Sequence, residues 1–80
     1  MTTAHELADR LEAIRKRRGI AVSALPEMTG IADKTLRRRL RNPAQFTISE
    51  LDALSDAFSI TLENLLNLDI AVEDLDEVAA

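Results

Sequence analysis

The sequence of 80 residues contains no cysteine, no tryptophan and no tyrosine, and His5 is its only histidine. Without cysteine, disulfide bonds and thiolate metal sites are excluded, which fits a reducing cytoplasm. A single imidazole also excludes a metal centre built from several histidines and a histidine-based catalytic dyad. Neither a phosphate-binding loop nor a nucleophile–base pair is recognisable. We therefore expect no enzymatic activity, no metal and no cofactor.

Glycine, proline and aromatic residues are scarce, with two glycines, two prolines and two phenylalanines. This leaves little room for β-turns, and β-branched residues never alternate over a long run, so an all-α fold is predicted. The length suits one domain with a modest aliphatic core. No apolar run approaches the ~20 residues of a membrane span, and a signal-peptide pattern is lacking. We expect a cytoplasmic protein without a membrane partner.

Positive charge is absent from residues 42–80. All ten basic residues lie between positions 10 and 41, where only three acids oppose them, whereas residues 42–80 carry nine acids. The net charge of −4 therefore conceals one segment of +7 and another of −9. Such a chain has one part that suits a polyanion and another that repels it. Solvated helix faces are the alternative explanation for the basic cluster.

Apolar spacing and capping residues predict five helices within residues 1–67. The first ends near Arg18, where Gly19 supplies a C-terminal stop. The second lies within residues 21–29 and is short, because Pro26 is tolerated only in the first turn of a helix.

Ser23 or Ala21 is the expected cap of this second helix. Gly30 then supplies the positive φ of a sharp turn before a third helix over about residues 33–41. The pattern Thr47–Glu50 predicts a capping box for the fourth helix, and a fifth short helix follows.

The third predicted helix has the pattern of a helix that reads DNA. Leu36 and Leu40, four residues apart, are expected to anchor it to the core. The long donors Lys34, Arg38 and Arg41 then share its outer face. Arginine and lysine donate to guanine in the major groove, and arginines on the flanks reach phosphates.

Four stretches of the sequence carry a family resemblance, namely residues 25–32, 35–36, 46–51 and 57–66. With them the chain resembles, from about Leu7 to Leu66, the Cro/lambda-repressor (Xre-type) helix-turn-helix family. Residues 37–47 are especially similar to small regulators from actinobacteria and their phages. The resemblance implies a compact five-helix, lambda-repressor-like DNA-binding domain whose helix-turn-helix is formed by helices two and three.

The expected DNA contacts fall into two groups. The resemblance places base contacts at the start of the recognition helix and one turn later: Asp33, Lys34, Thr35 and Arg38. Phosphate contacts are expected from Arg15, Arg18, Val22, Arg37, Arg39, Arg41 and Asn42. Two alternatives stay open, since Asp33 could instead cap its helix and residues 15–18 could be a solvated helix end.

Four positions depart from the family pattern. Val22 has no side-chain donor, so its backbone N–H must make the phosphate contact. Leu40 stands where the family has a glutamate partner for the arginine matched by Arg15, which leaves Arg15 free to reach a phosphate. Pro26 replaces a usual alanine between the motif helices, and Ala32 replaces a usual serine or threonine cap.

These expectations describe a sequence-specific transcriptional regulator of phage or prophage type. It would bind a palindromic operator in double-stranded DNA as a homodimer, with no small-molecule ligand evident. The predicted division is a DNA-binding domain over residues 1–67 and an acidic C-terminal tail over residues 68–80, mobile, helical or extended. The alternative function is a helical protein-binding module, such as an antitoxin, whose acidic tail engages a basic partner.

Overall fold

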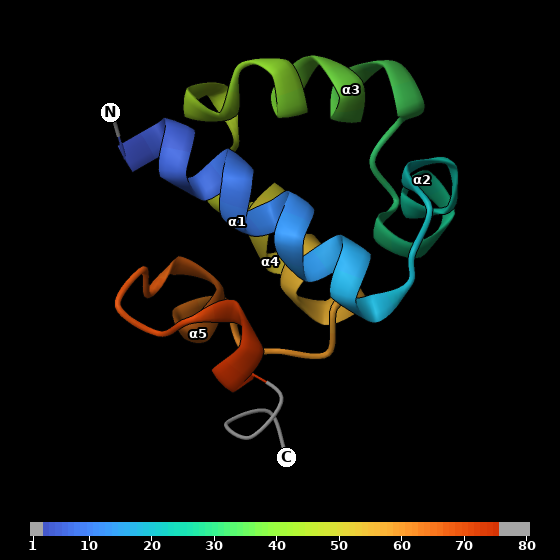
Figure 1. Ribbon diagram of the computed structural model, residues 1–80. Coiled ribbons are helices and arrows are strands. Elements are labelled where there is room, and N and C mark those ends of the chain that lie inside the picture. The colour runs from blue at the N-terminus through green and yellow to red at the C-terminus, as the bar shows by residue number, and fades with distance from the viewer. Residues whose placement is uncertain (1–2, 76–80) are drawn as a thin grey trace.

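The computed structural model describes residues 3–75, which form five α-helices and three 3-10 helices with no strand among them. The α-helices are α1 (Thr3–Arg18), α2 (Leu25–Thr29), α3 (Asp33–Arg41), α4 (Ile48–Ala57) and α5 (Leu62–Leu66). The 3-10 helices are η1 (Val22–Ala24), η2 (Pro43–Gln45) and η3 (Val72–Asp74). The predicted all-α, five-helix fold is therefore confirmed. Figure 1 shows α3 and α5 on opposite sides of α1.

Local sequence signals determine most helix ends. α1 ends at Arg18, and Gly19 follows with a φ of 69°; Gly30, after α2, has a φ of 75°. Both values lie in the left-handed region that glycine adopts without strain. The predicted capping box of α4 is complete: Thr47 Oγ1 accepts from the Glu50 N–H at 3.1 Å, and the Glu50 carboxylate accepts from the Thr47 N–H at 2.9 Å.

The start of α2 differs from the prediction. Ser23 does not cap it; the chain enters through η1, and the N-cap is Ala24, which makes no side-chain hydrogen bond. Pro26 still falls in the first turn of α2, where its missing N–H removes no intrahelical bond. The helix is short, as predicted.

The core is aliphatic apart from one phenylalanine and takes side chains from every α-helix. Its buried members are Leu11, Ile14, Leu25, Ile31, Leu36, Leu51, Leu54, Phe58, Ile60, Leu65 and Leu75. Leu36 has no exposed surface, and Leu40 is partly buried against the same core. These two leucines therefore hold α3 to the domain by one side, as its sequence predicts.

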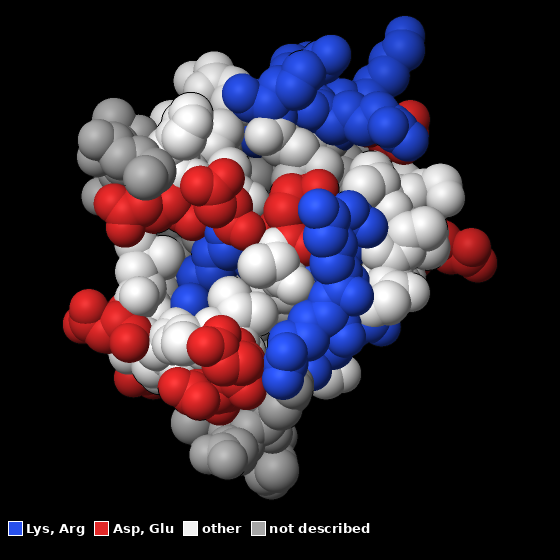
Figure 2. All heavy atoms as spheres, viewed as in Figure 1, with Lys and Arg blue, Asp and Glu red and all other residues white. Residues whose placement is uncertain are grey.

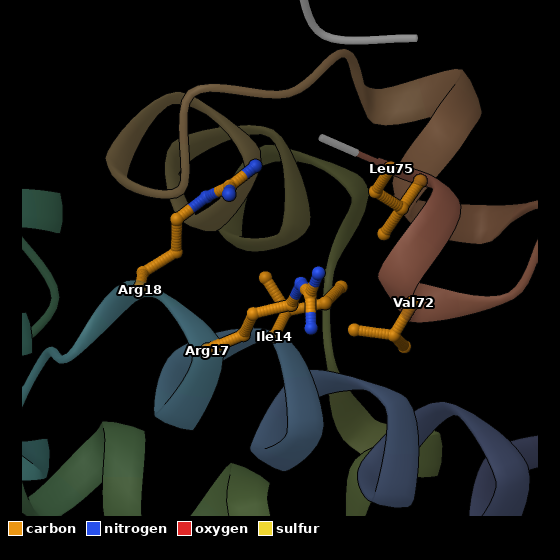
Figure 3. A pocket seen from close by; sticks show the side chains of 5 residues that line it. All are labelled: Ile14, Arg17, Arg18, Val72 and Leu75. Carbon is orange, nitrogen blue, oxygen red and sulfur yellow. The ribbon is translucent and has the colours of Figure 1, made fainter. Parts of the chain in front are cut away.

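Residues 68–75 differ from the predicted mobile tail. They turn back over α1, against which η3 packs. Leu75 is 1% exposed, and it lies with Val72 beside Ile14 at the basic end of α1 (Figure 3). Burying one leucine contributes roughly 1.5–3 kcal/mol, which favours an ordered segment despite its acidic neighbours. The rest of the predicted tail, residues 76–80, lies outside the described residues.

Arg10 binds this segment through hydrogen bonds. It is the only buried charged side chain among residues 3–75, with 6% exposure. Its Nε and Nη2 donate to the carbonyls of Leu65 and Asn64 at 2.7 and 2.8 Å, and its Nη1 donates to the Ile70 carbonyl at 2.5 Å. Two of these carbonyls belong to the last turn of α5, where backbone acceptors lack partners and a cation is favourable. Burial lowers the pKa of Arg10, yet arginine titrates so high that the group stays charged.

Replacing Leu75 with alanine is expected to lower the free energy of unfolding by about 2–4 kcal/mol, because it removes buried methyl groups and leaves a cavity. Urea denaturation followed by circular dichroism measures the change. Leu66→Ala is the matched control, since Leu66 is 39% exposed and truncating it should cost much less. Similar small losses for both variants would show that residues 68–75 do not pack on the domain.

Candidate nucleic-acid interface

The outer side of α3 carries three exposed cations. Lys34, Arg38 and Arg41 are exposed, and none of them forms a hydrogen bond or ion pair through its side chain within residues 3–75. Their spacing of four and three residues keeps them on one side of the helix, away from Leu36. Figure 2 shows basic side chains gathered along α3 at the top of the molecule. We call Lys34, Arg38 and Arg41 the cationic ridge.

Two further predicted base contacts lie at the start of α3. Asp33 pairs with Arg37 through Nε and Oδ1 at 3.0 Å, with side chains that are 54% and 51% exposed. The N-cap is Ala32 and receives no side-chain hydrogen bond, so Asp33 is not the cap that one alternative foresaw. An exposed pair of this kind contributes little, at most about 1 kcal/mol, and exchanges easily for another partner. Thr35 is half-buried beside the ridge.

Several predicted phosphate contacts meet at the other edge of α3. Val22, Arg37 and Arg41 line a hollow of about 260 Å³ together with Leu40. The two guanidinium groups come from successive turns of α3, and Val22 comes from η1, just before α2. Two cations around a hollow that admits water suit a phosphate group. Asn42 is exposed as the C-cap of α3.

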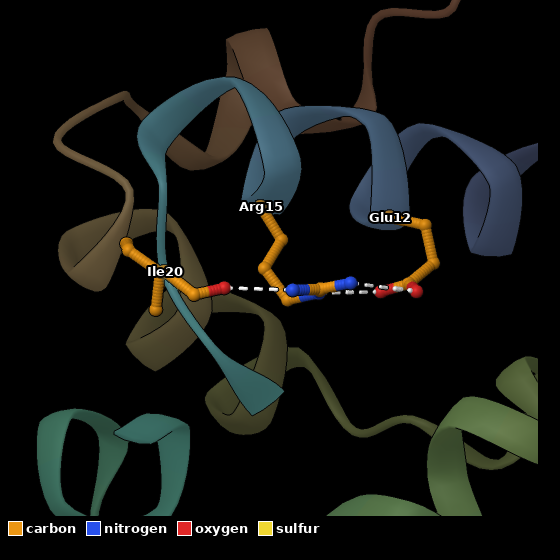
Figure 4. Close-up of polar contacts among 3 residues, drawn as sticks. All are labelled: Glu12, Arg15 and Ile20. Atoms are coloured by element: carbon orange, nitrogen blue, oxygen red, sulfur yellow. Dashed lines mark hydrogen bonds and ion pairs between the residues drawn. The ribbon is translucent and has the colours of Figure 1, made fainter. Parts of the chain in front are cut away.

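Arg15 is held by intramolecular bonds (Figure 4). Its Nε and Nη2 donate to the two carboxylate oxygens of Glu12 at 2.8 and 3.1 Å, and its Nη1 donates to the Ile20 carbonyl at 2.7 Å. The hydrogen bond from Arg15 lowers the pKa of Glu12. The expectation that Arg15 is free is therefore wrong: Glu12 supplies the carboxylate that Leu40 does not. The i,i+3 spacing of this pair was a signal in the sequence.

Arg39 and Arg18 also have partners inside the domain. Arg39 Nε lies 3.0 Å from Glu50 Oε1, with side chains only 19% and 16% exposed, and this pair joins α3 to α4. Arg18 Nε donates to the carbonyl of Phe58 at the end of α4. Removing one partner of such a contact would leave the other partly buried group unpaired, which is costly. These two predicted phosphate contacts therefore each have a partner inside the domain.

The chain is similar over residues 10–70 to the family model described as a Cro/C1-type HTH DNA-binding domain. It belongs to the Cro/C1-type helix-turn-helix family. The match spans most of the chain and includes both motif helices, so the predicted family is confirmed. The comparison with curated proteins gives no match, and neither does the comparison with solved structures.

As a Cro/C1-type domain, the protein is a DNA-binding regulator whose helix-turn-helix consists of α2, the turn at Gly30 and α3. In this motif the second helix is the one that enters the major groove. Between residues 3 and 75, no three potential metal-ligating side chains come together. No helix in that part of the chain is both long and apolar enough to cross a bilayer.

The capping box of α4 should make stability depend on acid pH. The hydrogen bond from the Thr47 N–H, followed by the hydrogen bond and charge of Arg39, lowers the pKa of Glu50. Glu50 therefore stabilises the fold above the unfolded-state value of about 4.3, and this contribution is lost as the pH falls through the lower folded-state pKa.

Glu50→Gln is expected to flatten the decline of Tm with pH below about 4.3, as measured by thermal unfolding. Glu63→Gln is the matched control, because Glu63 is exposed on α5 and has no cation partner among residues 3–75. The Glu63 variant should keep the unmodified protein's pH dependence. An unchanged slope in the Glu50 variant would contradict the assignment.

Proposed function

We propose that this protein is a sequence-specific transcriptional regulator that inserts α3 into the major groove of double-stranded DNA. The cationic ridge carries the proposal, since Lys34, Arg38 and Arg41 project, without a partner in the described part of the chain, from a helix that the core holds by its opposite side. An α-helix fits the major groove, which is about 12 Å wide. Neighbouring arginines that have partners inside the domain would keep this helix in place.

Base reading is assigned to the start of α3 and the following turn. Arg38 can donate two hydrogen bonds to O6 and N7 of guanine, and Lys34 can donate to the same atoms. Thr35 contributes a hydroxyl or a methyl contact. Asp33 can accept from cytosine N4 once its exposed pair with Arg37 opens.

Phosphate binding is assigned to the hollow at the other edge of α3. Arg37 and Arg41 supply cations, the Val22 backbone N–H supplies a donor, and Asn42 supplies an exposed amide beside them. Such contacts set affinity and orientation without reading sequence. Their position next to the residues assigned to base reading is compatible with docking on a duplex.

A net charge of −4 is compatible with this function because the charges are segregated. In Figure 2 the basic side chains along α3 occupy the top of the molecule, and most acidic side chains lie on its left and lower part. The molecule extends 32 × 28 × 20 Å, whereas electrostatic interactions in water are screened beyond about 8 Å at physiological salt. A duplex on the cationic ridge would therefore feel little repulsion from the acidic side.

Arg38→Ala is expected to weaken binding to the preferred duplex by about 1–3 kcal/mol while barely changing binding to random duplex, because the lost contact is to a base. Arg41→Ala is the matched control and should weaken both duplexes alike, reducing the salt slope by about one. Fluorescence anisotropy at several salt concentrations measures both. Equal losses on both duplexes for Arg38→Ala would make it a phosphate contact.

We further propose a homodimer on a palindromic operator, in a regulator of phage or prophage type, with residues 1–67 as the DNA-binding part and 68–80 as an acidic extension. A two-fold axis would place two copies of α3 in successive major grooves, roughly 34 Å apart. Selection from a random duplex pool is expected to yield a palindrome with half-sites about 10 base pairs apart. A consensus without two-fold symmetry would contradict the dimer.

A further inference from the structure

An open groove of about 480 Å³ lies between the first half of α1 and the C-terminal segment, away from α3. Its lining is largely apolar and comes from both elements: Ala13, Leu68, Ile70, Ala71 and Val72. Three exposed carboxylates border it, those of Glu6, Asp9 and Glu73. The groove exists because Arg10 and Leu75 hold the C-terminal segment against the domain.

The three carboxylates have no cation partner within the described chain. None of them forms a side-chain hydrogen bond or ion pair among residues 3–75, in contrast to Glu12 and Glu50. Arg10 also lines the groove, but its guanidinium donates three hydrogen bonds to main-chain carbonyls of the domain. Its single charge leaves the groove negative, so the carboxylates are available to cations from outside.

The charge and the lining together define which ligand fits. Nucleic acid is excluded from the groove by repulsion between phosphates and carboxylates. An apolar lining with a charged border is typical of grooves that take the apolar face of an amphipathic helix. Complementary charge at the border raises the association rate of the ligand and fixes its orientation in the groove.

We propose that this groove binds a basic amphipathic segment of another protein. Apolar side chains of the segment pack on Ile70 and Val72, and flanking lysines or arginines pair with the carboxylates. A second copy of this chain is a poorer occupant, because its basic residues other than Lys16 belong to the cationic ridge or have a partner within the protein, as Arg15 does. The proposal is independent of DNA binding: a partner in the groove leaves the cationic ridge uncovered.

A labelled synthetic peptide with leucines on one helical face and arginines beside them serves as the probe, read by fluorescence anisotropy. The variant Glu6→Gln/Asp9→Asn/Glu73→Gln is expected to bind it about tenfold more weakly, since it loses three exposed ion pairs. The matched control Asp52→Asn/Asp56→Asn/Glu63→Gln removes the same charge from side chains that do not line the groove. Its affinity should stay within about twofold of the unmodified protein. Equal losses in both variants would overturn the proposal.

Two further measurements test the apolar part of the groove. Ala13 is exposed on α1, so Ala13→Lys fills the groove with a good helix former and should abolish binding without loss of helix content. A peptide with serine in place of leucine should bind at least about tenfold more weakly than the probe. Equal binding of the two peptides would overturn the proposal.

Sedimentation and duplex binding separate the remaining outcomes. Self-association of the unmodified chain that Ala13→Lys abolishes would assign the groove to a second copy and overturn the proposal. Duplex affinity should be the same in the groove variants and the unmodified protein, which supports an independent site. Failure of the unmodified protein to bind any duplex would contradict the proposed function. It would not affect the conclusion drawn from peptide binding in the groove.

Discussion

The burial of Leu36 determines how α3 faces the solvent. Its side chain has no exposed surface, and Leu40, one turn later, packs on the same core. A helix held at two successive turns cannot rotate about its axis without exposing one leucine, at a cost of roughly 1.5–3 kcal/mol. The cationic ridge therefore points outward because its opposite side is apolar, and the proposed reading of DNA depends on that orientation.

Five arginines of this small domain fall into two groups by their partners. Arg10, Arg15 and Arg39 are buried or partly buried and donate to carbonyls or carboxylates, which they must do because an unpaired guanidinium is costly to bury. Arg38 and Arg41 are exposed and unpaired within the described chain. The number of basic residues in the sequence is thus larger than the number of cations available to DNA, since several arginines make contacts inside the domain.

Segregation of charge gives the molecule two sides with opposite preferences. The cationic ridge favours a polyanion, and the groove beside α1 favours a cation. Binding on the ridge should weaken as salt rises, because phosphate contacts release counterions. Binding in the groove should depend on salt less steeply, because apolar packing accompanies its exposed ion pairs. One small domain can therefore offer separate surfaces to DNA and to a protein.

Local and periodic features of this protein were determined by the sequence alone. The ends of α1 and α3, the capping box of Thr47 and Glu50, the turn at Gly30 and the two leucines of α3 depend on residues a few positions apart. Such short-range hydrogen bonds and helical spacings operate wherever the segment lies, so they can be read without the fold. The Glu12–Arg15 pair is equally local, since its partners are three residues apart.

Only the tertiary structure decided what distant residues do. Arg10 reaches carbonyls 54 to 60 positions away, Arg39 pairs with Glu50 across two helices, and Leu75 enters a core that its acidic neighbours did not suggest. The hollow of Val22, Arg37 and Arg41 likewise exists only once η1 and α3 are packed. Contacts between residues so far apart along the chain depend on how the helices pack against one another. The composition of each segment does not determine that packing, so these contacts could not be predicted from it.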